Sequence, residues 1–193
     1  MTTYPLALPT HTGIRSIEFR SVNAVAYERS PFTFVGQAQA SAGQMWMADV
    51  TLPPMKRADA EKWVAWLISL RGQFGTFYLG DPLADDAAGT ATSATITGIA
   101  GNNYVTTTMT GTLLAGDWFS LGSGSSKRLY KVTADRSGSG TMYIYPSLRA
   151  NASSAAADLT YPQGLFRLAS NETSWSVSEA SIYGISFSAM EAV

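Results

Sequence analysis

The sequence has no cysteine and only one histidine, His11. The missing thiols exclude disulfides, thiolate nucleophiles and thiolate metal sites together. One imidazole cannot supply the usual zinc ligand sets within a single chain. His11 also lies in a proline-flanked stretch without a partner at metal spacing. We therefore expect no metal or cofactor site, and we interpret His11 as an ordinary residue of an extended terminal segment.

Charge is also scarce. Asp, Glu, Lys and Arg make up 14% of the residues and the net charge is −1, whereas soluble domains carry roughly 25% charged residues. Without a basic excess to neutralise phosphates, we expect no specific nucleic-acid binding. Low charge combined with Tyr, Trp, Phe and Met is typical of protein–protein interfaces. A stable β domain with Ser- and Thr-rich strands has the same composition, so both interpretations stay open.

Long apolar runs are missing as well. No stretch approaches the ~18 residues of a membrane span, and the first residues, Met1 to Leu6, lack the basic and apolar regions of a secretory signal. We expect no membrane insertion. We also expect the protein to be made in the cytoplasm and to leave it only by assembly or lysis.

One helix is predicted over residues 56–70. Trp63, Trp66, Leu67 and Leu70 follow the i, i+3, i+4, i+7 spacing of a buried stripe. Pro53-Pro54 precede the helix, and Gly72 stands where a glycine C-cap is expected. A helix with this stripe must pack on a sheet.

The rest of the chain has β patterns. Alternation predicts strands within 13–50, including a separate strand opened by Phe32, Phe34 and Val35, and again from Phe74 to Leu79. Two stretches of small residues, 85–101 and 150–158, resemble linkers, and the first is alternatively the entry to an exposed hairpin. They flank short β runs typical of a small barrel. We therefore predict a mainly β fold with a β-sandwich host domain of residues 1–84 plus 162–193, one amphipathic helix, and an inserted barrel module of residues 85–161.

Candidate catalytic groups are few. Asp81, Asp85 and Asp86 surround Pro82, where a carboxylate pair for glycoside hydrolysis or a calcium site is conceivable, but aspartates near a proline are more often turn residues. Ser170 and Ser174 have no nucleophile elbow and no histidine base. We predict no catalytic residue and no enzyme.

Other short motifs are also weak. The stretch Gly122 to Lys127 is glycine-rich but lacks the spacing of a phosphate loop, so a hairpin loop is the better interpretation. Asn151 and Asn171 match the N-glycosylation pattern, which without a signal peptide is a chance match.

Aromatic residues gather in the predicted module and carry the remaining alternative. Trp118, Tyr130, Tyr143 and Tyr145 either form the core of the barrel, which we favour, or provide exposed rings for sugar stacking or subunit contact.

The order of several short motifs over most of the chain resembles the distal tail proteins of long-tailed phages and gene transfer agents. The motifs are Gly43-Gln44-Met45-Trp46, Thr51 to Arg57, Trp66-Leu67, Leu70 to Pro82, Leu114 to Asp117, Arg128 to Val132, Tyr145 to Arg149, Gly164 to Glu172 and Ile182 to Phe187.

The resemblance implies a structural virion protein at the tail tip. Members of this group form a six-membered ring that joins the tail tube protein to the tail hub, with a β-sandwich host domain and, in several members, an outward-facing insertion of the oligonucleotide/oligosaccharide-binding (OB) barrel type. The group has no catalytic residues. Two alternatives stay open: a carbohydrate-binding adhesion module that uses the insertion, and a tail-tube subunit.

Overall fold

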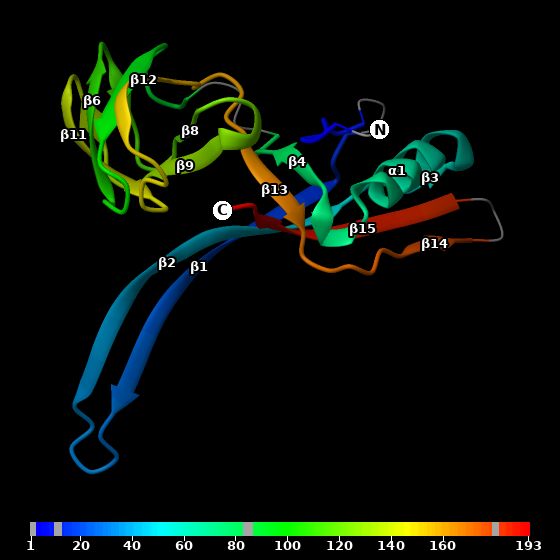
Figure 1. The fold of residues 1–193 in the computed structure, drawn as a ribbon, viewed down its shortest axis with the longest axis horizontal. Coiled ribbons are helices and arrows are strands. Elements are labelled where there is room, and N and C mark those ends of the chain that lie inside the picture. Colours follow the sequence, from blue (N-terminus) through cyan, green and yellow to red (C-terminus); the bar gives the residue numbers. More distant parts are fainter. Residues whose placement is uncertain (1–2, 10–12, 83–86, 179–181) are drawn as a thin grey trace.

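A computed structural model describes residues 3–9, 13–82, 87–178 and 182–193. Its most prominent feature is a long curved hairpin of β1 (Ser16–Arg29) and β2 (Gly36–Thr51), which projects from the body (Figure 1). The strands pair antiparallel from Ser16–Thr51 to Arg29–Gly36, with an irregularity between Asn23 and Val25. We call the projecting part, residues 23–43, the arm.

The base of the hairpin belongs to a seven-stranded sheet. Its order is β1-β2-β15-β13-β4, and two short strands also pair with β15. The further strands of this sheet are β3 (Met55–Lys56), β4 (Thr76–Leu79), β13 (Gly164–Leu168), β14 (Trp175–Val177) and β15 (Ile182–Glu191). In this half of the molecule the described strands thus share one hydrogen-bonded sheet, and a helix supplies the layer against it.

The helix, α1 (Arg57–Leu70), matches its prediction within one residue. Trp63, Trp66, Leu67 and Leu70 are all buried, and the two tryptophan rings meet Phe187 of β15 at centroid distances of 6.4 and 5.7 Å. Helical spacing placed these side chains on one face, and the sheet covers that face.

The helix ends differently from the glycine cap that we expected. The C-cap is Arg71, which adopts left-handed φ of 56°, and its N–H donates to the carbonyl of Ile68. Gly72 follows with φ of 67° and opens the 3-10 helix η1 (Gly72–Phe74). A Cβ at Gly72 would lie 2.7 Å from Oδ1 of Asn171, so close packing requires glycine there. The strand predicted from Phe74 consequently begins only at Thr76.

The first described segment covers the edge of β4. Leu6 donates to the carbonyl of Thr76 and accepts from the N–H of Tyr78, at 2.9 and 3.0 Å. The indole of Trp66 donates to the carbonyl of Ala7. This segment is therefore the irregular terminal strand that the prolines suggested.

Between β4 and β13 the chain builds a nearly closed barrel, visible at the top left of Figure 1. Its six main strands run in the order β12-β5-β6-β11-β9-β8, and a two-residue bridge between Ser120 and Asp158 closes the seam. The strands of this region are β5 (Ala94–Gly98), β6 (Tyr104–Met109), β7 (Thr112–Leu113), β8 (Trp118–Leu121), β9 (Arg128–Val132), β10 (Arg136–Ser137), β11 (Gly140–Tyr145) and β12 (Ala152–Ala157).

The two small-residue stretches are not mere linkers, and this part of the sequence interpretation was wrong. The first contains β5 and the second is largely β12, which pair with each other inside the barrel. Ala94 and Ile96 are buried on alternate positions of β5. Alanine has low β propensity, so these strands are set by cross-strand packing rather than by local preference.

The stretch Phe32 to Val35 is likewise not a strand but the turn of the arm. The N–H of Ser30 donates to the carbonyl of Val35, and the N–H of Phe34 donates back to the carbonyl of Ser30. Phe34 adopts φ of 58°. Ser30 and Pro31 thus start the loop that joins β1 and β2.

The mainly β class with one α-helix is confirmed. None of the helices in the described residues is long and apolar enough to cross a membrane.

Trp63 tests the helix–sheet contact. Because its side chain is 1% exposed, we expect Trp63→Ala to lower the free energy of unfolding by about 3–5 kcal/mol. Ile68→Ala, on the exposed side of the same helix, should change it by less than about 0.5 kcal/mol. Urea unfolding followed by tryptophan fluorescence measures both, and equal effects would contradict this packing.

Candidate functional site

The structure does not gather the candidate catalytic residues into one site. His11, Asp85 and Asp86 lie outside the described residues, and Asp81 lies just after β4. Within the described part of the chain, no three His, Asp or Glu residues lie close enough to hold a metal ion.

The glycine-rich stretch forms an ordered turn. Gly124–Ser126 is a 3-10 turn (η2), and the side chains of Ser123 and Ser126 form a reciprocal capping box. Nζ of Lys127 lies 3.0 Å from Oδ2 of Asp158. This lysine thus pairs with a carboxylate of its own chain, at the seam of the barrel.

The hydroxyl and amide candidates make local structure. Oγ of Ser170 accepts from the N–H of Glu172 at 3.0 Å, and Oδ1 of Asn171 accepts from the N–H of Gln73 at 3.1 Å. Oδ1 of Asn151 accepts from the N–H of Ala100 at 2.9 Å. Ser174 lines a cavity described below.

The four aromatic residues of the barrel divide between three environments. Tyr130 is in the barrel core and stacks on Phe119 at 5.3 Å. Trp118 instead joins the core of the seven-stranded sheet, 4.9 Å from Trp46. Tyr145 packs against the same core as Trp118, whereas Tyr143, alone among the four, is exposed. Our expectation that all four form the barrel core was therefore wrong for Trp118, Tyr143 and Tyr145.

A buried ion pair lies where the arm, the barrel and the C-terminal strand meet. Nη2 of Arg149 lies 2.7 Å from Oε2 of Glu191, and the carboxylate is 1% exposed. The same oxygen accepts from the N–H of Trp46 at 3.1 Å, and Arg149 also donates to the carbonyl of Gln44. The Arg149 guanidinium and the Glu191 carboxylate thus connect β2 to the barrel and to β15.

Hydrogen bonds beside this pair extend the junction. The hydroxyl of Tyr145 donates to the carbonyl of Val22 at 2.9 Å, and the side chain of Gln44 accepts from the N–H and the hydroxyl of Ser147. Burial raises the pKa of Tyr145, and the negative charge of Glu191 raises it further. Burial also raises the pKa of Tyr130, so both tyrosines near this junction keep their hydroxyl protons in neutral solution.

Beyond the junction, none of the other described segments covers the arm. Every residue from Asn23 to Gly43 except Ser30 is exposed. The register pairs Val25 with Ala40, Tyr27 with Ala38, Ala26 with Gln39 and Glu28 with Gln37. Since successive side chains point to opposite faces, Val25, Tyr27, Ala38 and Ala40 share one apolar face, and Glu28, Gln37 and Gln39 lie on the other.

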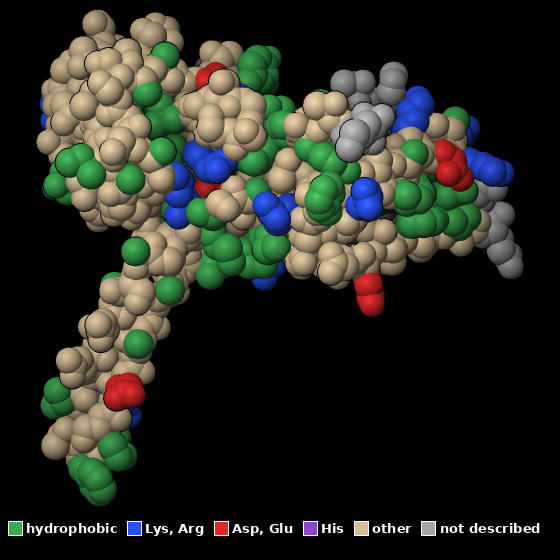
Figure 2. All heavy atoms as spheres, viewed as in Figure 1, with side chains coloured by type: hydrophobic (Ala, Val, Ile, Leu, Met, Phe, Trp, Pro, Cys, Tyr) green, Lys and Arg blue, Asp and Glu red, His purple; other side chains and the backbone are tan. Residues whose placement is uncertain are grey.

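The end of the arm is the most apolar exposed part of the described chain. Phe32 is 90% exposed, Val35 70% and Phe34 64%, and Figure 2 shows hydrophobic side chains gathered there. Oγ of Ser30 accepts from the N–H groups of Phe32 and Thr33. With the two backbone bonds of the turn, the tip therefore satisfies its N–H groups from Ser30 to Phe34 internally.

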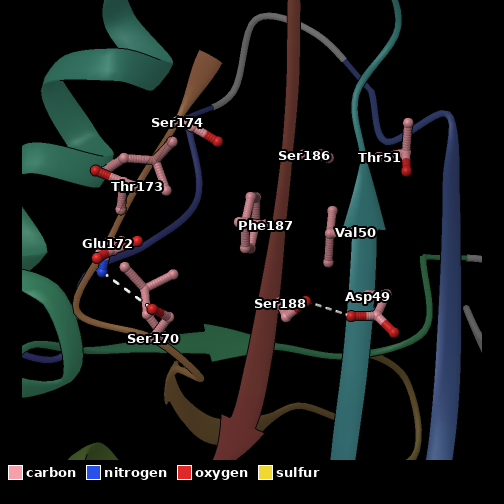
Figure 3. A pocket seen from close by; sticks show the side chains of 12 residues that line it. Asp49, Val50, Thr51, Ser170, Glu172, Thr173, Ser174, Ser186, Phe187 and Ser188 are labelled. Atoms are coloured by element: carbon pink, nitrogen blue, oxygen red, sulfur yellow. Dashed lines mark hydrogen bonds between the residues drawn. The ribbon is translucent and has the colours of Figure 1, made fainter.

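A cavity of about 360 Å³ lies on the body, between β2, β15 and the segment that leads into β14. Figure 3 shows its walls, with the hydroxyls of Ser170, Ser174 and Ser188 and the carboxylate of Glu172 around Val50 and Phe187. Ser188 donates to Asp49, which also pairs with Arg20. The described residues offer no hydrogen-bond or ion-pair partner to the Glu172 carboxylate.

Sequence reasoning missed both the arm and the ion pair. The alternation of Ala with Gln in 37–40 and of Val25 with Ala26 and Tyr27 was visible, but alternation says only that two faces differ. No local pattern links Arg149 to Glu191.

In comparisons with known proteins, no family model and no curated protein matches this chain.

The buried ion pair generates one prediction. Glu191→Ala leaves the Arg149 charge and the Trp46 N–H without their partner, so we expect a loss of about 3–5 kcal/mol in the free energy of unfolding. Replacing both partners, as in Arg149→Met with Glu191→Leu, should cost less than Glu191→Ala alone. Asp59→Ala, which removes the exposed pair with Lys62, should cost under about 1 kcal/mol. Urea unfolding measures these free energies. A double variant less stable than Glu191→Ala would contradict this view of the ion pair.

Asp158 generates a pH-dependent prediction. Burial raises the pKa of this carboxyl, but the N–H of Tyr161 and the ammonium of Lys127 more than offset the effect, so that its pKa lies below the usual range. Its contribution is therefore present above the unfolded pKa of about 3.9 and is lost as the pH falls through the folded pKa. We expect Lys127→Met to reduce the difference in stability between pH 7 and pH 3, measured by urea unfolding. An unchanged difference would exclude this role for Lys127.

Proposed function

We propose that this chain is a non-enzymatic structural subunit that assembles with further copies of itself into a closed ring. We propose further that the ring is the distal adaptor of a phage-type tail, located in the virion between the tube protein and the hub of the tip. Self-assembly is supported by the arm, and the tail setting and the ring of six by the resemblance of the sequence motifs.

The observation that carries the proposal is the uncovered apolar face of the arm. A two-stranded hairpin alone in water is marginally stable, and contiguous exposed apolar surface marks interaction sites. The arm has both properties, with Val25 and Tyr27 at 52% and 63% exposure on the same face. A second protein surface that covers this face explains why the sequence keeps it apolar.

The position of the arm favours a head-to-tail arrangement. An arm that projects from one side of the body meets a different surface on the next copy, which makes a heterologous contact. Such contacts close into rings when the rotation allows it and otherwise give open filaments. A closed ring corresponds to the adaptor, whereas an open stack corresponds to the tail-tube alternative.

A second candidate function, carbohydrate adhesion by the barrel, has one observation in its favour. Tyr104 and Tyr143 are cross-strand partners on β6 and β11 and both are about half exposed. Exposed rings of this kind can stack on sugars. Trp118, which we considered as such a platform, is 6% exposed in the core and does not serve this purpose.

Light scattering of the purified protein over a range of concentrations tests assembly. We expect a discrete oligomer, and we expect Val25→Ser with Tyr27→Ser to shift it toward monomer by about a hundred- to ten-thousandfold in concentration, because the serines remove roughly 1.5–3 kcal/mol of apolar burial per site. The melting temperature of the monomer should change little because both residues are exposed.

Tyr104→Ser with Tyr143→Ser is the matched control. It removes two exposed rings from the barrel and should leave assembly unchanged. A protein that stays monomeric at all concentrations, also beside tube and hub proteins, would contradict the ring. Oligosaccharide binding that this control abolishes would then favour the adhesion function.

A further inference from the structure

The arm tip carries a cation beside an aromatic ring. Arg29 lies over the ring of Phe34, with its guanidinium carbon 4.6 Å from the ring centroid. Among the described residues Arg29 has no carboxylate partner. The tip therefore offers an aromatic ring and a cation side by side.

The cavity beside Glu172 offers a surface complementary to the ring and the cation of the arm tip. Its floor is apolar, with Val50, Leu67 and Phe187, and its rim carries the Glu172 carboxylate, which lacks a hydrogen bond or ion pair within the described chain. A volume of about 360 Å³ exceeds the ~150 Å³ that accommodates a benzene ring. The site can thus take a phenyl group together with a cation.

The charge of the lining residues distinguishes this cavity from three others on the body. Three further cavities, of about 320, 460 and 450 Å³, have Arg128 with Arg149, Lys131, and Arg149 in their walls, respectively. Each of these three walls already carries a cationic side chain, and that of Arg149 is paired with Glu191. The cavity beside Glu172 has no Lys or Arg among its lining residues.

A protein partner fits the arm better than a lipid surface does. A bilayer met end-on covers only the tip, whereas the apolar face continues along the shaft through Tyr27 and Val25. The tip also enters a protein cavity at little cost, since its N–H groups from Ser30 to Phe34 are internally bonded or absent, as in Pro31.

We propose that Phe34 of one copy enters the cavity beside Glu172 of the next copy, and that Arg29 pairs there with the Glu172 carboxylate. This inference rests on the proposed self-assembly and names its contact. Within one chain the tip of the arm lies far from β15 and from the segment that leads into β14 (Figure 1), which border the cavity, so the contact forms only between copies.

Cross-linking tests the contact directly, because the chain has no cysteine of its own. Thr33→Cys with Ser174→Cys places one thiol at the tip and one at the cavity rim. Under mild oxidation of the full-length protein we expect disulfide-linked dimers and longer chains. Thr33→Cys with Ser153→Cys, in which the second thiol lies at the exposed barrel seam, is the matched control and should stay monomeric on a denaturing gel.

Charge reversal tests the pairing. Arg29→Glu and Glu172→Arg should each raise the concentration needed for assembly at least about tenfold, because each sets like charges against one another. The combined variant should restore assembly, since every contact in the ring then has the reversed pair. A combined variant as weak as the sum of the single ones overturns the pairing.

The two proposals can fail separately. Wild-type oligomers together with equal cross-linking at Ser174 and Ser153 would keep the ring and overturn this contact. Monomeric wild type that still cross-links selectively through Ser174 would keep the contact and overturn the ring. Monomeric wild type without selective cross-linking overturns both.

Discussion

The ion pair between Arg149 and Glu191 is the constraint on which the arrangement of the molecule depends. It lies where the base of the arm, the connection between β11 and β12 of the barrel and the C-terminal strand converge, and both partners hold β2 backbone groups. A buried pair adds little net stability compared with apolar side chains of similar volume. Its value lies in geometry, because only one arrangement of the three elements satisfies both charges.

The aromatic cluster beside the ion pair also holds the barrel against the seven-stranded sheet. Phe19 and Trp46 from the hairpin, Trp118 and Tyr145 from the barrel, and Phe166 from β13 contact one another at 4.8 to 6.4 Å. Nondirectional burial brings the two halves together, and the directional bonds of Tyr145, Ser147 and Arg149 fix their relative orientation. The arm leaves the body from this fixed point, so its direction is defined by contacts that are themselves buried.

Sequence patterns predicted the helix well and the arm poorly, for physical reasons. The Trp63–Leu70 stripe has a period that only a helix puts on one face. A strand period, in contrast, says that two faces differ and not whether either is covered, so the exposure of Val25 and Tyr27 could not be foreseen. Ala152–Ala157 was taken for a linker because small residues carry weak local preference. Glu191 stands in an unremarkable context, and its burial follows only from a tertiary partner.

The barrel leaves the host sheet after β4 and returns at β13, two strands that pair with each other, with Gly164 opposite Leu79. By chain connectivity alone it could be excised and the gap closed by a short turn. The contacts between the barrel, β2 and β15 make such an excision unfavourable. Excision would uncover Phe19 and Trp46 and leave the Glu191 carboxylate buried without its counter-charge. Removal of the barrel therefore requires simultaneous changes in the hairpin base and in the C-terminal strand.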